Sequence, residues 1–388
     1  PLMKHASMHI LFATVLIGTL AHAAVRLVPQ NYPNIQAAVN AAVNGDTVLV
    51  ADGTFTGAGN RDIELLGKAI TVRSLNGASN TTLDVKAGQS QYHNAFNVHS
   101  GETSLTVIQG FTITGGHMFN GGGMLLMGSS PTIRQCVFTE NQSDCWGAGL
   151  YFDGGASPLI DECVFDSNFS SDDGGAIFGL NGSPTISNTR ITNNEGSFTG
   201  GAITIFGSGS PKLINSTLVG NNAFYGSAIY SNNLTVSNSI IWGNTGGAEQ
   251  IYTANGQFSA TVHHSIVQGG FAGQGNLNVA PTFVDSANGN FHLASGSAGI
   301  DDGDPGLLVP AGTLDSDGDP RVFGAAIDMG FDEFRKRGDV TGDHIVNIAD
   351  LLAVVGAWGP CSWSTADLNG DFSVNISDLL IVVSGWGM

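Results

Sequence analysis

Residues 174–199 read GGAIFGLNGSPTISNTRITNNEGSFT, and residues 200–225 read GGAITIFGSGSPKLINSTLVGNNAFY. Both stretches open on a glycine pair, carry Ser-Pro in the middle and continue through an asparagine. The same features recur on either side, so the sequence holds an internal repeat with a period of 26 or 27 residues. The repeat starts at Gly121, Gly147, Gly174, Gly200 and Gly226, and its prolines are Pro131, Pro158, Pro184 and Pro211.

Each repeat contains short runs of alternating apolar and polar residues separated by Gly, Ser and Asn, a pattern typical of β-strands joined by turns. One repeat cannot bury its own apolar side chains, so successive repeats must stack, each strand pairing with its copy in the next. The sequence therefore predicts an all-β fold, a right-handed parallel β-helix with about three strands per coil of about 26 residues. Its interior should hold the large apolar residue that stands seven positions after each proline: Phe138, Phe165, Ile191 and Leu218.

An asparagine stands ten positions after each of the same prolines: Asn141, Asn168, Asn194 and Asn221. Asparagine tolerates a left-handed backbone, and its amide can hydrogen-bond to copies above and below, so we expect a structural column at a tight turn. Cys136 and Cys163 also occupy equivalent positions in successive repeats. The sequence leaves open whether these two form a disulfide or stack as free thiols, and it leaves the state of Cys145 and Cys361 equally open.

A short amphipathic helix is expected ahead of the repeats. Ile35, Val39 and Val43 fall on one helical face, with Pro33 near its start and Gly45 at its end. Such a helix would cover the apolar end of the first coil, where unpaired strand edges favour aggregation.

Residues 1–24 have the features of a signal peptide. Lys4 provides a basic start, residues 10–20 form an apolar run too short to span a bilayer, and small residues follow at Ala21 and Ala23. Met3 or Met8 is the expected start. We expect a chain that is secreted or displayed at the cell surface, with no transmembrane segment after cleavage.

The overall charge excludes two classes of partner. The formal net charge is −19, and nucleic acids or anionic membranes require clustered Lys and Arg to displace counterions. We therefore expect no nucleic-acid partner.

Two acidic loops end the sequence. Residues 339–352 read DVTGDHIVNIADLL, and residues 367–380 read DLNGDFSVNISDLL, 28 positions later. Oxygen donors fall at positions 1, 3, 5, 7, 9 and 12 of each loop, which is the calcium-ligand spacing of an EF-hand. The expected Ca²⁺ ligands are Asp339, Thr341, Asp343, Ile345 through its carbonyl, Asn347 and Asp350, then Asp367, Asn369, Asp371, Ser373, Asn375 and Asp378.

These features carry two family resemblances. Residues 30–56, the GGAI and SPTI repeats and the asparagine column resemble secreted right-handed β-helix proteins of the pectate-lyase-like superfamily, and GIDDGDP through GAAIDMGFDEF resembles their closing segment, expected at residues 280–334. Residues 338–388 resemble a type I dockerin, which implies a cohesin-like protein partner and attachment to an extracellular assembly or surface.

The tail departs from the dockerin pattern at two places. His344 and Phe372 stand at position 6, where EF-hand loops usually have Gly. Positions 10 and 11 hold Ile348-Ala349 and Ile376-Ser377 in place of the usual Ser or Thr pairs. We expect a signal peptide at 1–24, a β-helix at 25–334, a linker at 335–337 whose basic side chains are solvated, and a dockerin-like domain at 338–388.

Stacking would bring the segments after each asparagine side by side. They supply three carboxylates, Asp144, Asp172 and Asp173, and five aromatic residues, Trp146, Phe169, Phe198, Phe224 and Tyr225. Aromatic rings stack on the apolar faces of sugars, and two carboxylates can divide the acid, base or nucleophile roles of glycoside hydrolysis. The groove could bind carbohydrate without turnover, or belong to a hydrolase with these aspartates as catalytic candidates. The alternative is that these segments form a solvated edge of loops that neither binds nor cleaves a sugar.

A polysaccharide lyase is a further possibility, implied by the resemblance alone. Residues 100–300 contain only Arg134, Arg190 and Lys212 as basic side chains, against twelve Asp and Glu. Such a surface would repel polyuronates unless metal ions bridge them. The sequence does not name the polymer.

Overall fold

The computed structural model describes residues 23–86, 91–253, 259–307, 309–310, 313–315, 317–361, 364–369 and 373–386. Residues 1–22 of the expected signal peptide lie outside these ranges, as do Asp371 and Phe372 of the second acidic loop. Over the described ranges, the helices are all too short or too polar to cross a membrane.

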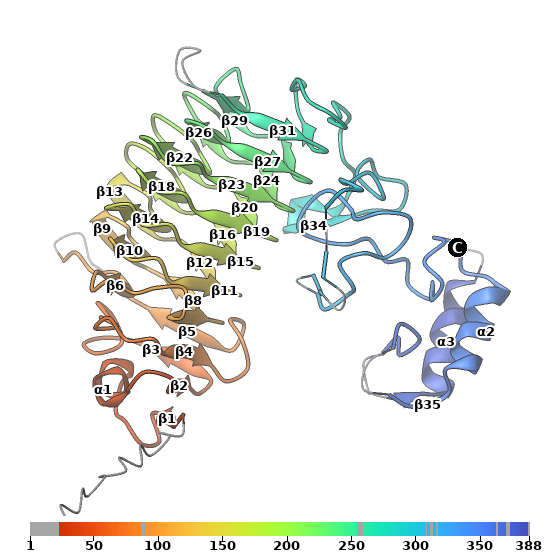
Figure 1. The fold of residues 1–388 in the computed structure, drawn as a ribbon, viewed down its shortest axis with the longest axis horizontal. Coiled ribbons are helices and arrows are strands. Elements are labelled where there is room, and N and C mark those ends of the chain that lie inside the picture. Colours follow the sequence, from red (N-terminus) through yellow and green to blue (C-terminus); the bar gives the residue numbers. More distant parts are fainter. Residues whose placement is uncertain are drawn as a thin grey trace, which may run out of the picture.

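A right-handed parallel β-solenoid forms the body of the protein, as the repeat predicts (Figure 1). Every strand pairs in parallel with the equivalent strand of the coils before and after it, so four sheets, named A to D here, run along the stack. Within one coil the chain passes through sheets A, B, D and C in that order.

Sheet A consists of β1 (Val25–Val28), β2 (Thr47–Val50), β4 (Thr71–Ser74), β7 (Val107–Gln109), β11 (Thr132–Arg134), β15 (Leu159–Asp161), β19 (Thr185–Ser187), β23 (Lys212–Ile214), β27 (Thr235–Ser237) and β31 (Thr261–His263). Sheet B consists of β3 (Gly53–Phe55), β5 (Thr81–Asp84), β8 (Thr112–Thr114), β12 (Val137–Thr139), β16 (Val164–Asp166), β20 (Arg190–Thr192), β24 (Thr217–Val219), β28 (Ile240–Trp242) and β32 (Ile266–Val267).

Sheet C consists of β6 (Phe96–Val98), β10 (Met124–Met127), β14 (Leu150–Asp153), β18 (Ile177–Leu180), β22 (Ile203–Phe206), β26 (Ile229–Ser231) and β30 (Ile251–Tyr252). Sheet D consists of β9 (His117–Asn120), β13 (Gln142–Trp146), β17 (Phe169–Ser170), β21 (Glu195–Gly196), β25 (Asn222–Ala223) and β29 (Thr245–Gly246).

The central coils thus have four strands rather than the three expected. The additional column, sheet D, lies in the segments after the asparagines, which were expected to be loops. These segments stay extended for two or more residues before they turn, and equivalent residues pair across coils, as Gln142 does with Phe169 and Phe169 with Glu195. Runs of two residues are too short to give a periodic signal in the sequence.

The interior is filled by stacked copies of the repeat's apolar positions. Phe138, Phe165, Ile191 and Leu218 are fully buried, and the rings of Phe138 and Phe165 stack with centroids 4.5 Å apart. Cys136 and Cys163 lie buried in the same core as free thiols, Cys145 is also a free thiol, and the Cys361 thiol lies 3.6 Å from a carboxylate oxygen of Asp367. Burial raises the pKa of the Cys136 thiol to about 11, so it packs as a small neutral apolar group.

The asparagine column forms a continuous ladder. The side-chain carbonyl of each asparagine accepts hydrogen bonds from the backbone N–H and side-chain amide of the asparagine one coil earlier, at 3.1 and 3.0 Å for Asn168 and Asn141. The ladder extends to Asn244, whose amide donates to Gln250 at 2.8 Å. The left-handed residue is not the asparagine but the one before it, such as Ser167 with φ 57°. The backbone N–H of each asparagine instead donates to the side chain of the next copy, as that of Asn168 does to Asn194 at 3.0 Å.

The N-terminal helix α1 (Ile35–Ala41) caps the first coils. Ile35 and Val39 are fully buried and join the solenoid core, with Ala38 beside them. The helix ends at Ala41, and the chain becomes extended at Ala42. Val43 is therefore off the helical face on which it was expected, and it is 54% exposed.

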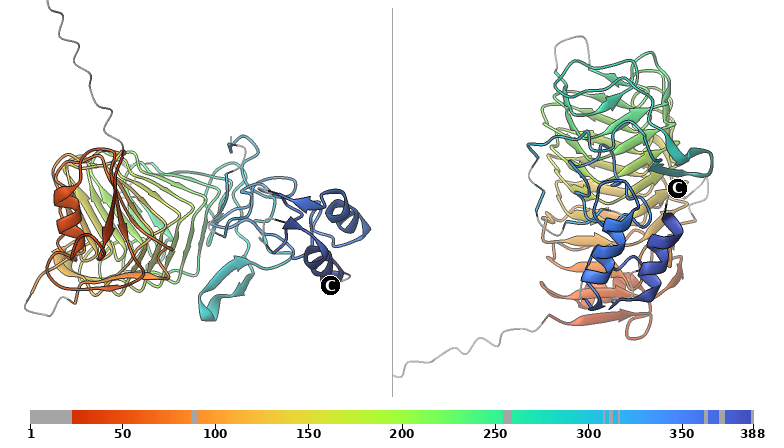
Figure 2. Two further views of the ribbon diagram at one scale, coloured as in Figure 1. Left: turned by 90° about the horizontal axis from the view of Figure 1, so that it is seen from below. Right: turned by 90° about the vertical axis from the view of Figure 1, so that its right-hand side faces the viewer.

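The closing segment, residues 280–334, folds back along the side of the stack (Figure 2). It contains β33 (Phe283–Asp285), the 3-10 turn η2 (Ser286–Asn288) and β34 (Asn290–Leu293), and β33 and β34 pair antiparallel. Gly330 N–H donates to the carbonyl of Asn238 at 2.7 Å, and Asp304 N–H to the Asn238 side chain at 2.7 Å. Asn238 lies between β27 and β28, so the segment covers the corner between sheets A and B.

The C-terminal tail is a helix pair with its own core. The helices α2 (Ile348–Gly356) and α3 (Ile376–Gly385) pack around Val340, Val346, Val354, Val374 and Val382, and the two-residue strands β35 (Gly359–Pro360) and β36 (Ser373–Val374) pair antiparallel.

Arg335, expected to be solvated, instead joins the closing segment to the tail. Its guanidinium lies 2.8 Å from Asp319, donates to the carbonyl of Thr365 and stands over the ring of Phe323.

Candidate functional site

The outer face of sheet C carries a row of aromatic side chains. Tyr151, Phe178, Tyr230 and Tyr252 occupy one register position, interrupted only by Thr204. Their neighbours in the same strands, such as Leu150 and Ile177, belong to the interior core, so the aromatic position faces outward. Sequence analysis missed this row because it considered only the segments after the asparagines.

Trp146 packs on that row at one end. Its ring lies parallel to Phe178 with centroids 5.1 Å apart and to Tyr151 with centroids 6.2 Å apart. Tyr151 and Phe178 are consequently buried, although they point away from the core. Trp146 therefore packs against two buried rings and is itself only partly exposed.

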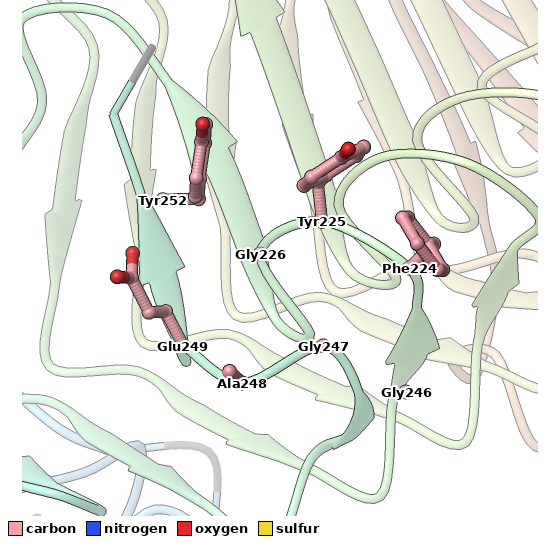
Figure 3. Close-up of a pocket in the computed structure, with 8 residues that line it drawn as sticks. All are labelled: Phe224, Tyr225, Gly226, Gly246, Gly247, Ala248, Glu249 and Tyr252. Atoms are coloured by element: carbon pink, nitrogen blue, oxygen red, sulfur yellow. The ribbon is translucent and has the colours of Figure 1, made fainter. Parts of the chain in front are cut away.

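Phe198, Phe224 and Tyr225 converge at the other end. The Tyr225 ring lies 5.4 Å from Phe198, 4.7 Å from Phe224 and 5.5 Å from Tyr252, centroid to centroid. Figure 3 shows Phe224, Tyr225 and Tyr252 projecting on the same side of the ribbon from neighbouring coils. Phe198 and Phe224 are more than half exposed. Phe169 is also exposed, but none of the described aromatic rings contacts it.

A cleft of about 380 Å³ opens among these rings and is lined by Phe224, Tyr225, Glu249 and Tyr252 with the glycines between them. Two further hollows adjoin it. One of about 260 Å³ shares Phe224 and contains Glu195, and one of about 410 Å³ shares Glu249 and continues to Phe271. The first two hollows lie along sheet D and its edge with sheet C, and the third runs from β30 of sheet C to β32 of sheet B.

The candidate aspartates lie on earlier coils along the same edge, in different environments. Asp144 accepts hydrogen bonds from Tyr92 and, at 2.8 Å, from His117, and these lower its pKa. Asp173 is 8% exposed and accepts a hydrogen bond from Thr199 at 2.6 Å; burial nevertheless raises its pKa. Asp173 pairs in register between Trp146 and Thr199, and Asp172 precedes it, half-buried.

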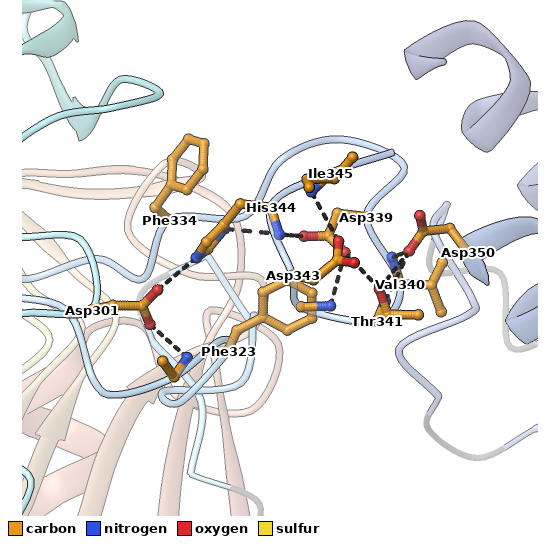
Figure 4. Close-up of polar contacts among 12 residues, drawn as sticks. Asp301, Phe323, Phe334, Asp339, Val340, Thr341, Asp343, His344, Ile345 and Asp350 are labelled. Carbon is orange, nitrogen blue, oxygen red and sulfur yellow. Dashed lines mark hydrogen bonds and ion pairs between the residues drawn. The ribbon is translucent and has the colours of Figure 1, made fainter. Parts of the chain in front are cut away.

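The first acidic loop folds around its carboxylates (Figure 4). Asp339 accepts N–H bonds from Gly342 and His344 at 2.8 and 2.7 Å. Asp350 accepts from Val340 and Thr341 at 2.9 and 3.0 Å, and from Asn347 at 2.8 Å as part of the capping box of α2. Although burial acts to raise its pKa, these bonds hold the pKa of Asp350 below its usual value.

The donor set fits a calcium ion. Carboxylate oxygens of Asp339, Asp343 and Asp350 all lie within 4.8 Å of one another, and the side chains of Asp339 and Asp350 are fully buried. Three carboxylates in that space repel one another unless a cation lies between them. Asp378 repeats the same pattern in the second loop, accepting from Leu368, Asn369 and Asn375.

His344, at position 6 of the first loop, adopts a left-handed conformation with φ 59°. Its Nε2 lies 2.8 Å from Asp301 of the closing segment, and its ring lies 5.5 Å from that of Phe334 (Figure 4). The residue that departs from the usual glycine therefore ties the first acidic loop to the closing segment.

Each tail helix exposes an apolar stripe. Ile348, Leu352 and Val355 on α2 and Ile376, Leu380 and Val383 on α3 are all about half exposed or more, at positions 28 residues apart. Trp358 and Trp386 extend the two stripes. An exposed apolar surface of this kind, repeated twice, is typical of a protein-docking site.

Family comparisons agree with both parts of the chain. The model described as right handed beta helix region matches residues 43–230 and 141–300, which together exceed half of the sequence, so the chain belongs to the right-handed β-helix family. The dockerin type I domain model matches residues 337–385. Dockerin domains generally bind calcium and cohesins, and β-helix proteins that carry them are typically extracellular.

No curated protein matches the chain significantly. Among solved structures, a pectin methylesterase in complex with a hexasaccharide has a TM-score of 0.40 and 9% identity, covering 66% of this chain and 82% of the enzyme. The pectate lyase Pel9A has a TM-score of 0.38 and 15% identity, covering 80% and 96%. Matches at these identities and TM-scores say nothing about the activity of this chain.

Proposed function

We propose that the protein is an extracellular, dockerin-borne module that binds a polysaccharide along the edge between sheets C and D. The observation that carries the proposal is the convergence of Phe224, Tyr225 and Tyr252 on one cleft of about 380 Å³. Aromatic rings bury the apolar faces of sugars while leaving the hydroxyls in water. Because coils repeat about every 4.8 Å, rings on successive coils can follow one extended chain.

The charge of the cleft favours a neutral glycan. The three hollows contain Glu195 and Glu249, and within the described part of the chain no Lys or Arg lines them. A polyuronate would meet like charge there unless calcium bridged it. The same composition weighs against a lyase, since a lyase of this kind needs a basic side chain near its substrate.

The tail supplies the attachment. We propose that Asp339, Thr341, Asp343, Ile345, Asn347 and Asp350 bind one calcium ion and that the equivalent residues of the second loop, including Asp371 beyond the described ranges, bind another. Calcium would hold the loops closed and the helices paired, presenting the stripes of α2 and α3 to a cohesin. The domain limits at 25–334 and 338–388, the linker between them and the signal peptide at 1–24 belong to the same proposal.

Glycoside hydrolysis is a second candidate function. Carboxylates whose pKa values are shifted in opposite directions can divide the acid and base roles, and on successive coils the pKa of Asp144 is lowered while that of Asp173 is raised. Asp173→Asn or Asp172→Asn should then abolish the release of new chain ends and leave glycan binding intact. Wild-type protein that binds a glycan but releases no ends over a long incubation would exclude this candidate.

The binding proposal is tested by affinity electrophoresis and calorimetry against neutral and acidic polysaccharides, with and without calcium. Tyr252→Ala and Phe224→Ala should each weaken binding of the retained glycan by about 1 to 3 kcal/mol, as loss of a stacked ring does elsewhere. Phe119→Ala is the matched control, because Phe119 is an equally exposed ring in sheet D four coils away. Equal loss in all three variants, or none, would refute the cleft as the binding site.

A further inference from the structure

A second cluster of metal-ligating side chains lies far from the calcium loops, where the closing segment meets the solenoid. His292 of β34, Asp317 and Asp332 bring one ligand atom each within 4.8 Å of the other two. Nε2 of His292 is 2.9 Å from Asp317 and 3.9 Å from Asp332. Ligand atoms around one ion lie roughly 3 to 3.5 Å apart when the metal bonds are about 2 Å long, so small side-chain shifts would close this set around a metal.

The hydrogen bonding of His292 fixes which nitrogen faces the cluster. The side-chain oxygen of Asn290 accepts from the backbone N–H of His292 at 3.2 Å and lies 2.6 Å from its Nδ1. An amide oxygen cannot donate, so Nδ1 carries the proton and Nε2 is left to face the two carboxylates. A backing partner of this kind is typical of metal-bound histidines.

One atom of the cluster lacks the partner that burial demands. Nε2 of His292 is sealed from solvent and, despite its closeness to Asp317, makes no hydrogen bond of adequate geometry. Asp332 is 7% exposed, and its carboxylate lies 3.9 Å from that nitrogen. A buried carboxylate beside a buried lone pair is costly unless a cation lies between them.

The charged groups around the cluster are compatible with a bound cation. Asp315 adds a further carboxylate nearby. The neighbouring guanidinium groups are already engaged: Arg190 donates to the carbonyl of Gly289, and Arg321 donates to that of Gly330 at 2.6 Å and pairs with Glu333 at 3.4 Å.

We propose that His292, Asp317 and Asp332 bind one divalent transition-metal ion such as Zn²⁺. One imidazole with two carboxylates suits such ions better than calcium, which prefers oxygen ligands alone. His292 and Asp317 also line a cavity of about 200 Å³, so the ion has an open side where water completes its coordination. The ion clamps the β33–β34 hairpin to the remainder of the closing segment.

The test uses the full chain, stripped with chelator and returned to saturating calcium so that the tail loops are filled. Calorimetry with Zn²⁺ should show one site per chain, Zn²⁺ should raise Tm, and Co²⁺ should give a visible absorption band. His292→Ala and the near-isosteric Asp332→Asn should each weaken Zn²⁺ affinity about tenfold or more. His99→Ala is the control, because His99 lies beside Glu64 at 3.5 Å on the surface.

Asp332→Asn also separates metal loss from misfolding. It removes a buried charge, so without Zn²⁺ the variant should melt at or above the wild-type Tm, yet Zn²⁺ should no longer raise that Tm. The proposal is overturned if wild type binds no Zn²⁺ in excess calcium, if both cluster variants bind as wild type does, or if His99→Ala loses affinity equally.

Discussion

Removing one amide from the asparagine ladder should destabilise the solenoid. Asn168 is 1% exposed. Its amide donates to the carbonyl of Phe138 at 2.9 Å and to Asn194 at 2.8 Å, and its side-chain oxygen accepts from the backbone and side chain of Asn141. Asn168→Ala leaves the backbone N–H of Asn141 buried without its acceptor.

The magnitude follows from that backbone group. A buried polar group left without a hydrogen bond costs about 1 to 3 kcal/mol, so the substitution should lower the free energy of unfolding by about that amount. That is a measurable part of the total for a typical domain, about 5 to 15 kcal/mol. Each coil contacts only its neighbours, so the loss should be felt first in the coils around Asn168.

Guanidinium unfolding followed by far-ultraviolet circular dichroism, in saturating calcium, measures this free energy. Asn193→Gly is the control, since Asn193 is exposed, has φ 56° and can be replaced by glycine without strain. It should change the free energy by no more than about 0.5 kcal/mol. A change of that size or smaller in Asn168→Ala would show that the ladder does not stabilise the fold.

Three further outcomes are expected. The isolated tail, residues 338–388, should show a stronger helical signal in circular dichroism when it takes up two calcium ions. Asp350→Asn should reduce the number of ions bound to one. A helical signal that changes neither with chelator nor with calcium would contradict this. His344→Gly removes the 2.8 Å contact with Asp301, so in saturating calcium proteases should cut residues 335–337 faster than in wild type. N–H bonds from Val43 and Ala24, with a salt bridge to Arg26, lower the pKa of Asp46. Its contribution to stability is therefore complete above the ordinary aspartate pKa of about 3.9 and lost as the pH falls through the lower folded value, so Asp46→Asn should lower Tm at pH 7 and lower it progressively less as the solution is made more acidic than that.

The sequence determined the solenoid because a period of 26 or 27 residues leaves few alternatives. Residues equivalent to Phe138, Asn141 and Gly147 recur at fixed offsets in the sequence. The structure places each set at equivalent positions of the central coils. Sheet D escaped detection since its strands have as few as two residues. The end of α1 at Ala41 was also missed, because Val43 continues the apolar pattern beyond the last helical residue.

Only part of the cleft could be predicted from the sequence. Phe198, Phe224 and Tyr225 come from segments that sequence analysis singled out, whereas Tyr252 and Glu249 come from the last coils, where the repeat becomes irregular. Contacts between distant segments were likewise invisible. Nothing in the spacing of His344 and Asp301, 43 residues apart, indicates that they meet.

The position of the closing segment keeps the two proposed binding surfaces apart, so that both can be occupied at the same time. Since Asn238 and Thr217 hold that segment at the corner between sheets A and B, the tail projects from that side of the solenoid. Sheets C and D, with the aromatic cleft, form the other side of the coil (Figures 1 and 2). A glycan lying along Tyr225 and Tyr252 would therefore not obstruct a protein partner docked on α2 and α3. The contacts of Arg335 and His344 hold the tail in that orientation. Arg335 was expected to be solvated, and His344 stands where the usual loop has glycine. Both residues fix the tail against the closing segment.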